Sequence, residues 1–198
     1  FGTMHLFRTG EEWQSAPLNK LGIEPLSDEF TPEAFERVLG RRTTKIKPLL
    51  LNQEIIAGLG NIYVDEALHM AGIHPLRTAD SLKKREKQKL YDAIVSTLSA
   101  AVEAGGSSVK SYVNGQGEMG MFQHRLKAYG RTGEPCFTCG SPIVKLVVGG
   151  RGTHVCPKCQ RAPKGTKTDA PSESSGQKHP NAVKRRLDGK QKAGRTAL

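Results

Sequence analysis

The sequence predicts a mainly α-helical fold followed by one small β-hairpin. Apolar residues recur at helical spacing between residues 31 and 104, and Gly or Pro residues mark the end of each helical stretch. The chain has four cysteines in two C-x-x-C pairs, and two short runs typical of strands lie between those pairs. These patterns favour a helical body and place most of the β structure between the cysteine pairs.

The first element that we expect is a β-strand over residues 1–7, which ends at Thr9-Gly10. A single strand has no sheet to join and leaves its polar backbone edge bare. We therefore expect the chain to be a fragment whose upstream sheet is missing.

Four helices follow this segment. Thr31-Pro32-Glu33 is typical of a helix start, with Thr as the N-cap and Pro in the first turn, and Gly40 ends that helix. A short second helix opens at Lys47-Pro48, and Gly72 ends the third. The predicted ranges are 32–39, 47–51, 63–71 and 81–104.

The cysteine pairs predict a metal centre. The two-residue spacing lets both sulfurs of a pair reach one ion, so four thiolates can hold one tetrahedral zinc. The expected ligands are Cys136, Cys139, Cys156 and Cys159. The alternative is two structural disulfides, which the absence of a visible secretory signal and the low density of cysteines disfavour.

Residues 143–155, between the cysteine pairs, read as two short strands joined at a Gly-Gly-Arg-Gly turn. This arrangement predicts a hairpin that the metal pins at its base and that displays Arg151 at its tip.

The charge of the chain indicates a polyanionic partner. The 198 residues carry a formal net charge of +11, and nucleic acid is the commonest partner of such an excess. Residues 161–198 hold ten Lys or Arg against three Asp or Glu and are poor in large apolar side chains, so we expect a disordered basic tail. That tail either adds non-specific phosphate affinity or is only a solvated segment. No apolar run is long enough to span a bilayer, and metal-type cysteine pairs suggest a reducing cytoplasm.

The Gly58-Leu59-Gly60-Asn61 turn between the second and third helices is a candidate phosphate site. Gly58 and Gly60 let the backbone approach a ligand closely, and the following helix start presents free amides at a positive dipole end. Asn61 adds a side chain that can donate to the same phosphate. The alternative is a plain tight turn, which the Gly-x-Gly-Asn pattern favours when it is taken alone.

Three stretches together resemble one protein family. Residues 51–68, residues 111–123 with Tyr129-Gly130-Arg131, and the cysteine hairpin occur in the order of the formamidopyrimidine-DNA glycosylase and endonuclease VIII family. The middle stretch favours the formamidopyrimidine branch. The resemblance covers the chain from its first residue to about Arg161. It implies an N-terminal β-sandwich remnant over 1–21, a helix-two-turn-helix DNA-binding domain over 22–110, a lesion-capping loop and connector over 111–126, and a zinc finger over 127–161, with the tail at 162–198 outside.

The resemblance implies a base-excision DNA repair enzyme, a bacterial-type cytoplasmic monomer that binds double-stranded DNA. The family flips an oxidised purine, such as 8-oxoguanine or a formamidopyrimidine, out of the stack, cuts its glycosidic bond and cleaves the backbone by β,δ-elimination. Its nucleophile is an N-terminal proline amine, which falls upstream of Phe1 here. Two alternatives remain: an endonuclease VIII-type glycosylase for oxidised pyrimidines, and a non-catalytic zinc module that binds DNA.

The resemblance also implies roles for two residues at the phosphates. Asn61 and Arg151 match residues that grip phosphates beside the flipped nucleotide, and a guanidinium offers a planar fork for phosphate oxygens. The family's finger arginine, here Arg151, is also credited with proton donation. A side chain with a pKa above about 12 is better suited to charge stabilisation, so we expect that catalytic role for Arg151.

Other positions carry two interpretations each. Lys47 matches a phosphate-contacting lysine and is otherwise a solvated helix-end charge. Tyr129 matches a residue near the phosphate backbone and is otherwise a core tyrosine. Phe1 matches the wedge that fills the gap left by the flipped base, and it is also a strand residue. His154 lies close to Cys156, but four thiolates already complete a zinc shell, so we exclude it as a ligand.

Overall fold

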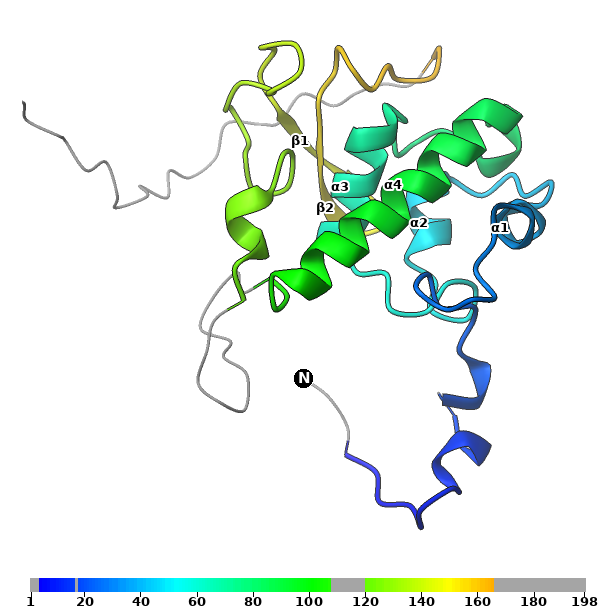
Figure 1. Cartoon of the computed structure of the whole chain (residues 1–198). Helices are drawn as coiled ribbons and strands as arrows, with labels where there is room; N and C mark the ends of the chain where they lie inside the picture. The colour runs from blue at the N-terminus through cyan, green and yellow to red at the C-terminus, as the bar shows by residue number, and fades with distance from the viewer. Residues whose placement is uncertain (1–3, 17, 108–119, 166–198) are drawn as a thin grey trace, which may run out of the picture.

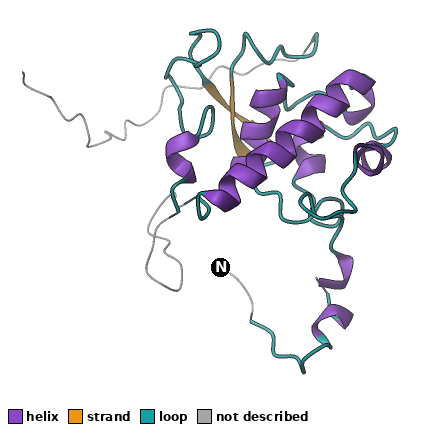
Figure 2. Ribbon diagram, in the orientation of Figure 1, coloured by secondary structure: helices purple, strands orange, loops and turns teal. Residues whose placement is uncertain are grey.

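The computed structural model describes residues 4–16, 18–107 and 120–165 (Figure 1). Within those ranges the chain is mostly helical and has one antiparallel two-stranded sheet, so the predicted fold class is confirmed (Figure 2). No helix in the described part of the chain is long and apolar enough to cross a membrane. Phe1, most of the expected lesion-capping loop and nearly all of the basic tail lie outside the described residues.

Helix α1 (Pro32–Leu39) forms where the sequence predicts it. The Thr31 side chain accepts a hydrogen bond from Ala34 N at 3.1 Å and so caps the helix start. Gly40 ends the helix with a φ of 51°, a backbone conformation that favours glycine. The helix packs against α4 (Lys84–Glu103), so the local signals and the tertiary contacts agree.

Helices α3 (Asn61–Ala71) and α4 form the centre of the helical body, and α2 (Ile46–Leu50) lies beside α3 (Figure 1). α3 begins at Asn61 rather than Tyr63, because Gly60 is its N-cap. α4 begins later than predicted, because residues 79–81 form a separate 3-10 turn and Glu86 closes a capping box at the true start of the helix.

Two separate apolar clusters stabilise the described chain. The large one lies among the helices and includes Phe35, Leu39, Ile46, Leu50, Leu59, Val64, Leu68, Leu90, Ile94 and Leu98. The small one lies in the zinc-finger segment and consists of Cys136, Ile143 and Cys156. A cluster of that size buries too little apolar surface to stabilise a domain, so the finger depends on its metal and on contacts with the helices.

Strands β1 (Val144–Val148) and β2 (Arg151–Val155) form the antiparallel hairpin, in which Arg151 pairs with the last residue of β1. Gly149 and Gly150 have φ values of 57° and 74°, which gives a two-residue turn that favours glycine at both positions. The prediction of a four-residue Gly-Gly-Arg-Gly turn is therefore wrong, because Arg151 is already the first residue of β2. Its exposed side chain still lies beside the tip.

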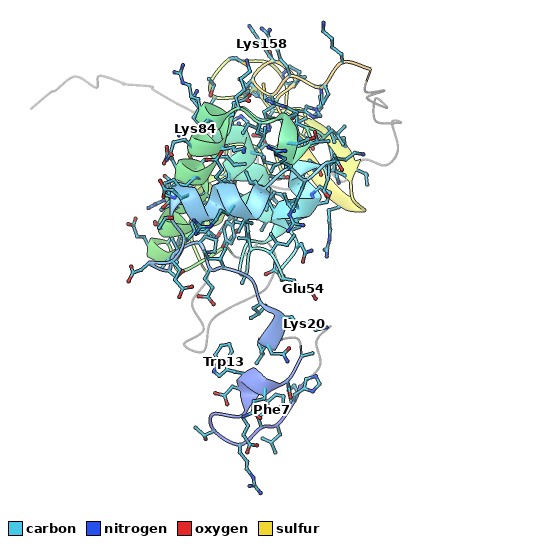
Figure 3. The ribbon with its side chains drawn as sticks, turned by 90° about the vertical axis from the view of Figure 1, so that its right-hand side faces the viewer. Phe7, Trp13, Lys20, Glu54, Lys84 and Lys158 are labelled. Carbon is cyan, nitrogen blue, oxygen red and sulfur yellow. The ribbon has the colours of Figure 1, made fainter. Side chains whose placement is uncertain are left out.

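The strand expected over residues 1–7 does not form in the described part of that segment. The chain there has no regular structure and continues into two 3-10 turns, Glu12–Gln14 and Leu18–Lys20. A strand needs a partner for its backbone groups, and no described strand lies beside this segment. Figure 3 shows Trp13 on this segment, away from the helical body.

Candidate metal centre and nucleic-acid interface

The four cysteines form one compact cluster. Their sulfur atoms all lie within 4.8 Å of one another, and the Cys136–Cys159 and Cys139–Cys156 sulfurs are 4.0 Å and 3.4 Å apart. Sulfurs held at about 2.3 Å by a tetrahedral zinc stand roughly 3.8 Å from one another, so the cluster fits one zinc ion. All four thiols are free, and their separations exceed the roughly 2.05 Å of a disulfide bond, so the disulfide alternative does not hold.

The thiols of this cluster influence one another's protonation. Hydrogen bonds from the Ser141 backbone and hydroxyl lower the pKa of the Cys139 thiol to about 6. Burial and hydrogen bonds with the neighbouring thiols raise the pKa of the Cys159 thiol to about 12. Four thiolates in one place repel one another unless a cation neutralises them. Zinc supplies that charge, and its binding releases the protons of the thiols.

A buried glutamine ties the second cysteine pair to the helical body. Gln160 is 0% exposed, and its Oε1 accepts from Cys156 N at 2.9 Å. Its Nε2 donates to the Ile73 carbonyl, also at 2.9 Å, just beyond the end of α3. The position of the metal cluster relative to α3 is therefore fixed by a side chain whose polar atoms are satisfied at both ends.

Helix α3 presents a row of polar residues to the finger. Asn61, Asp65 and His69 follow one another at intervals of four residues and so lie on one face of the helix. Asn61 Nδ2 donates to the Gly152 carbonyl at 3.1 Å, and His69 Nε2 lies 3.4 Å from the Cys136 sulfur. One helix thus contacts both the hairpin and the metal cluster.

Lys47 and Asp65 form a buried ion pair under the hairpin. Both side chains are 0% exposed, and Lys47 Nζ lies 2.6 Å from Asp65 Oδ1. The other carboxylate oxygen, Oδ2, accepts from the His154 backbone N at 2.9 Å. Burial lowers the pKa of Lys47, and the attraction of the Asp65 carboxylate opposes that shift. The pair joins α2, α3 and β2 at one point.

Lys47 is not placed for the phosphate contact that the family resemblance implies, and it is not a solvated charge either. Its Nζ also donates to Thr153 Oγ1 at 2.8 Å and to the Gly152 carbonyl at 3.2 Å. Together with Asp65, these acceptors use all three hydrogens of the ammonium. The physical reason is that α2 turns this side chain inward, where it holds the strand that carries Arg151.

The Gly152 carbonyl brings Asn61 close to Arg151, two residues that the sequence predicts to bind phosphate. It accepts from both Lys47 Nζ and Asn61 Nδ2, so the start of α3 and the start of β2 lie side by side. Arg151 precedes this carbonyl and is exposed. Asn61 Oδ1 is buried and has no hydrogen-bond partner among the described residues. Asn61 and Arg151, which are far apart in the sequence, therefore lie at one surface.

The turn before α3 exposes its glycine backbone. Gly58 and Gly60 are exposed, while Leu59 between them is 0% exposed and anchors the turn in the core. Gly58 has a φ of 78°, and its N–H donates to Gln53 Oε1 at 2.8 Å. The first amides of α3 have no partner within the helix, so this end of the helix offers donors to an anion.

Tyr129 is half-buried beside the hairpin rather than in the main core. Its ring meets the His154 ring edge-on, with 4.8 Å between the centroids. Its backbone N donates to Glu66 Oε1 at 2.8 Å, and Glu66 also accepts from the backbone N of Lys127 and Ala128 at 2.7 Å and 2.9 Å. One buried carboxylate on α3 thus fixes three consecutive amides and places Tyr129 next to the finger.

Sequence reasoning missed the residues that join the finger to the helices, which are Asp65, Glu66, His69, Thr153 and Gln160. A sequence signal exists for Asp65 and Glu66: they are adjacent acids inside an apolar helix, and buried acids must find hydrogen-bonding partners. Their partners lie far along the chain and leave no local pattern.

A cavity of about 470 Å³ lies between the start of α3 and the end of α4. It is lined by Gly58 of the turn, by Tyr63 of α3, and by Leu98 and Ala101 of α4, among others. Gly106 also lines it, so the cavity adjoins the beginning of the connection to the finger, of which residues 108–119 lie outside the described ranges.

Two family models match separate parts of the chain. The formamidopyrimidine-DNA glycosylase H2TH domain matches residues 21–113, and the zinc finger found in FPG and IleRS matches residues 133–162. The formamidopyrimidine-DNA glycosylase of Brevibacillus brevis is 62% identical over 161 residues, which are 81% of this chain and 58% of that protein. The same enzyme of Cytobacillus firmus is 61% identical over 160 residues, with shares of 81% and 58%.

Solved structures agree with these matches. The crystal structure of the MutM (Fpg) protein from Thermus thermophilus has a TM-score of 0.72 and 47% identity, over 75% of this chain and 57% of that one. A complex of Lactococcus lactis Fpg with DNA containing an abasic site has a TM-score of 0.68 and 45% identity, over 72% of this chain and 52% of that one. The chain spans 58% of the length of the curated relatives named above. Both domains, the relatives and the solved structures show that the chain belongs to the formamidopyrimidine-DNA glycosylase family.

Proposed function

We propose that this chain provides the DNA-binding and zinc-finger half of a bifunctional DNA glycosylase and AP lyase that removes oxidised purines in base-excision repair. One observation carries the proposal: the Gly152 carbonyl holds Asn61 and the strand of Arg151 at one surface. The curated relatives are formamidopyrimidine-DNA glycosylases, which supports the proposal. Similar Lactococcus lactis structures contain DNA with Fapy-dG or with an abasic site.

The surface at Asn61 and Arg151 offers two kinds of phosphate donor. The start of α3 supplies backbone amides and the positive end of the helix dipole, with the Asn61 amide beside them. Arg151 supplies an exposed planar cation on a strand that buried contacts hold in place. Such contacts fix the register of a protein on the DNA backbone without reading sequence, which suits an enzyme that must find damage in any sequence.

Arg151 also suits the cleavage step. In strand cleavage by elimination the leaving group is a phosphate, and a fixed guanidinium stabilises the negative charge that develops there. The buried Lys47 contributes indirectly, because it orients β2. One chain supplies every residue of this surface, so we propose that the enzyme acts as a monomer, in the bacterial cytoplasm where the nucleoid lies.

DNA titrations test the binding role. Arg151→Ala and Asn61→Ala should each weaken binding to a duplex with a tetrahydrofuran abasic-site analogue by about tenfold, because a hydrogen bond to a charged group contributes roughly 1.5–3 kcal/mol. Arg151→Ala should also reduce the dependence of the logarithm of affinity on the logarithm of salt concentration by about one. The matched control is Arg85→Ala, an exposed arginine at the start of α4. If both site variants bind like the control, the two loops do not face DNA.

The basic tail provides a second comparison in the same titrations. Deletion of residues 166–198 should chiefly lower the salt dependence, because dispersed cations release counterions without holding particular phosphates. A tail deletion that abolishes preference for the abasic-site duplex would assign damage recognition to the tail instead.

Catalysis requires the amine that the family resemblance places upstream of Phe1. The chain by itself should bind DNA without excising 8-oxoguanine. Joined to an N-terminal domain of the family, it should release the base, cut the strand and be trapped on DNA by borohydride. Excision by the chain alone, or strand cutting by the joined protein without a trappable imine, would contradict the proposed mechanism.

A further inference from the structure

The His69 side chain contacts a zinc-ligand sulfur from outside the finger. Its Nε2 lies 3.4 Å from the Cys136 sulfur, a distance within the range of N–H···S hydrogen bonds. The contact is enclosed, because His69 is 6% exposed and Cys136 is 2% exposed. Other donors to these sulfurs come from the cysteine segments themselves, such as the Cys159 backbone N, which donates to the Cys156 sulfur at 3.4 Å.

The surroundings of the imidazole select one tautomer. His69 Nδ1 is buried and has no hydrogen-bond partner among the described residues. A proton on Nδ1 would leave a buried N–H unsatisfied and would turn the lone pair of Nε2 toward the sulfur. A proton on Nε2 gives the sulfur a donor and leaves Nδ1 as an unpaired acceptor, which is the smaller cost. The geometry therefore favours the Nε2–H form, which donates to Cys136.

A donor at this sulfur has a chemical effect on the metal. Four thiolates around one Zn²⁺ leave an excess of negative charge on the sulfurs. A buried N–H directed at one of them withdraws electron density from that sulfur and fixes its position, which is the usual role of groups that surround metal ligands. Because His69 lies on α3, this hydrogen bond also joins the zinc finger to the helical body.

We propose that His69 is a positioning residue of the metal centre: its Nε2–H donates to the Cys136 sulfur, stabilises the zinc–thiolate cluster and slows the release of zinc. The role concerns the metal and not the DNA, so it stands whether or not the proposed repair activity is correct.

Two substitutions separate the hydrogen bond from the bulk of the ring. His69→Phe keeps a ring of similar size and removes the donor, while His69→Gln places an amide N–H near the position of Nε2. The matched control is His74→Phe, which replaces another buried histidine; His74 is 2% exposed and its Nδ1 accepts from Leu76 N. The control reproduces the loss of a buried imidazole without changing a donor to sulfur.

The first measurement is the rate at which zinc passes from the full chain to a chromogenic chelator. His69→Phe should release zinc about tenfold faster, since loss of a group that supports a metal ligand typically weakens metal binding by about 10–100-fold. His69→Gln and His74→Phe should release zinc at close to the rate of the unaltered chain. Equal rates for His69→Phe and His74→Phe would overturn the proposal.

The second measurement is the sulfur-to-metal charge-transfer absorption of the cobalt-substituted chain. Loss of a donor makes the sulfur more electron-rich, so the band of His69→Phe should move to longer wavelength, and that of His69→Gln should not. An unmoved band in His69→Phe would overturn the proposal. A third measurement needs no variant: nitrogen NMR of the zinc-loaded chain should show the Nε2–H tautomer of His69, and the Nδ1–H tautomer would contradict the assignment even if a substituted chain failed to fold.

Discussion

Replacement of Lys47 by Met tests whether the buried ion pair holds the finger on the helical body. Met keeps most of the aliphatic length of lysine but removes the ammonium. Asp65 Oδ1, the Thr153 hydroxyl and the Gly152 carbonyl therefore each lose a donor. Both members of the pair are 0% exposed, so water does not replace the lost contacts without opening the structure.

The expected cost follows from the charge that stays behind. Removal of one partner from a buried ion pair typically costs about 3–5 kcal/mol of unfolding free energy, because the other charge is left without compensation. Asp65 keeps the His154 backbone N–H at 2.9 Å, so we expect about 3 kcal/mol for Lys47→Met. Adding Asp65→Asn removes the stranded charge, and the double variant should recover at least about 1 kcal/mol of that loss.

Urea unfolding of the zinc-loaded chain, followed by circular dichroism, measures these differences. The matched control is Lys87→Met, which removes a lysine from a pair whose side chains are 16% and 45% exposed and should cost less than about 1 kcal/mol. The reasoning is refuted if Lys47→Met costs no more than Lys87→Met. It is also refuted if the losses from Lys47→Met and Asp65→Asn simply add in the double variant.

Three further predictions concern other contacts of the described chain. Glu66→Gln should lower the free energy of unfolding in urea by about 2–3 kcal/mol, because a carboxylate that accepts from three backbone amides is replaced by a group with one acceptor oxygen. An unchanged urea midpoint would contradict this prediction. Hydrogen bonding from Arg77 holds the pKa of Glu86 below its usual value of 4.5, so this pair stabilises the fold fully above pH 4.5 and the effect is lost as the pH falls through the lower, folded-state pKa. Glu86→Gln should therefore lower the thermal midpoint most at pH 7 and progressively less as the pH is lowered below 4.5; an equal effect at every pH would contradict this. Removal of zinc by a chelator should unprotect the amides of β1 and β2 in hydrogen exchange but leave most of the helical circular dichroism, because the two apolar clusters are separate; loss of both together would show that they unfold as one unit.

Local signals in the sequence were sufficient for much of the fold. Thr31 and Gly40 mark the ends of α1 through the capping of that helix itself, and the C-x-x-C pairs indicate the metal cluster through their spacing. The strand expected at residues 1–7 shows the limit of such signals, because a strand depends on partners that lie elsewhere. The turn of the hairpin is two residues shorter than predicted for a related reason. The strands pair as soon as Gly149 and Gly150 have reversed the chain, and that pairing depends on the partner strand.

The candidate site depends more strongly on contacts between distant residues. Lys47 reads in the sequence as a cation at a helix start, and its burial follows only when Asp65 and Thr153, 18 and 106 residues further on, are brought to it. Asn61 and Arg151 were accessible to sequence reasoning because each directly follows a glycine-containing turn that the sequence shows. The carbonyl that joins them belongs to Gly152, a residue with no side chain to signal its role.

Helix α3 has a consequence for how the metal and the nucleic acid act on each other. Asn61 at the start of α3 contacts the strand that carries Arg151. His69, about 12 Å further along the same helix, contacts the sulfur of the zinc ligand Cys136. Two ligands that both favour the docked finger must strengthen each other's binding by the same factor. If zinc raises the affinity of the chain for DNA through this arrangement, then DNA raises the affinity of the chain for zinc by the same factor, and a competing chelator removes less zinc at equilibrium when DNA is present.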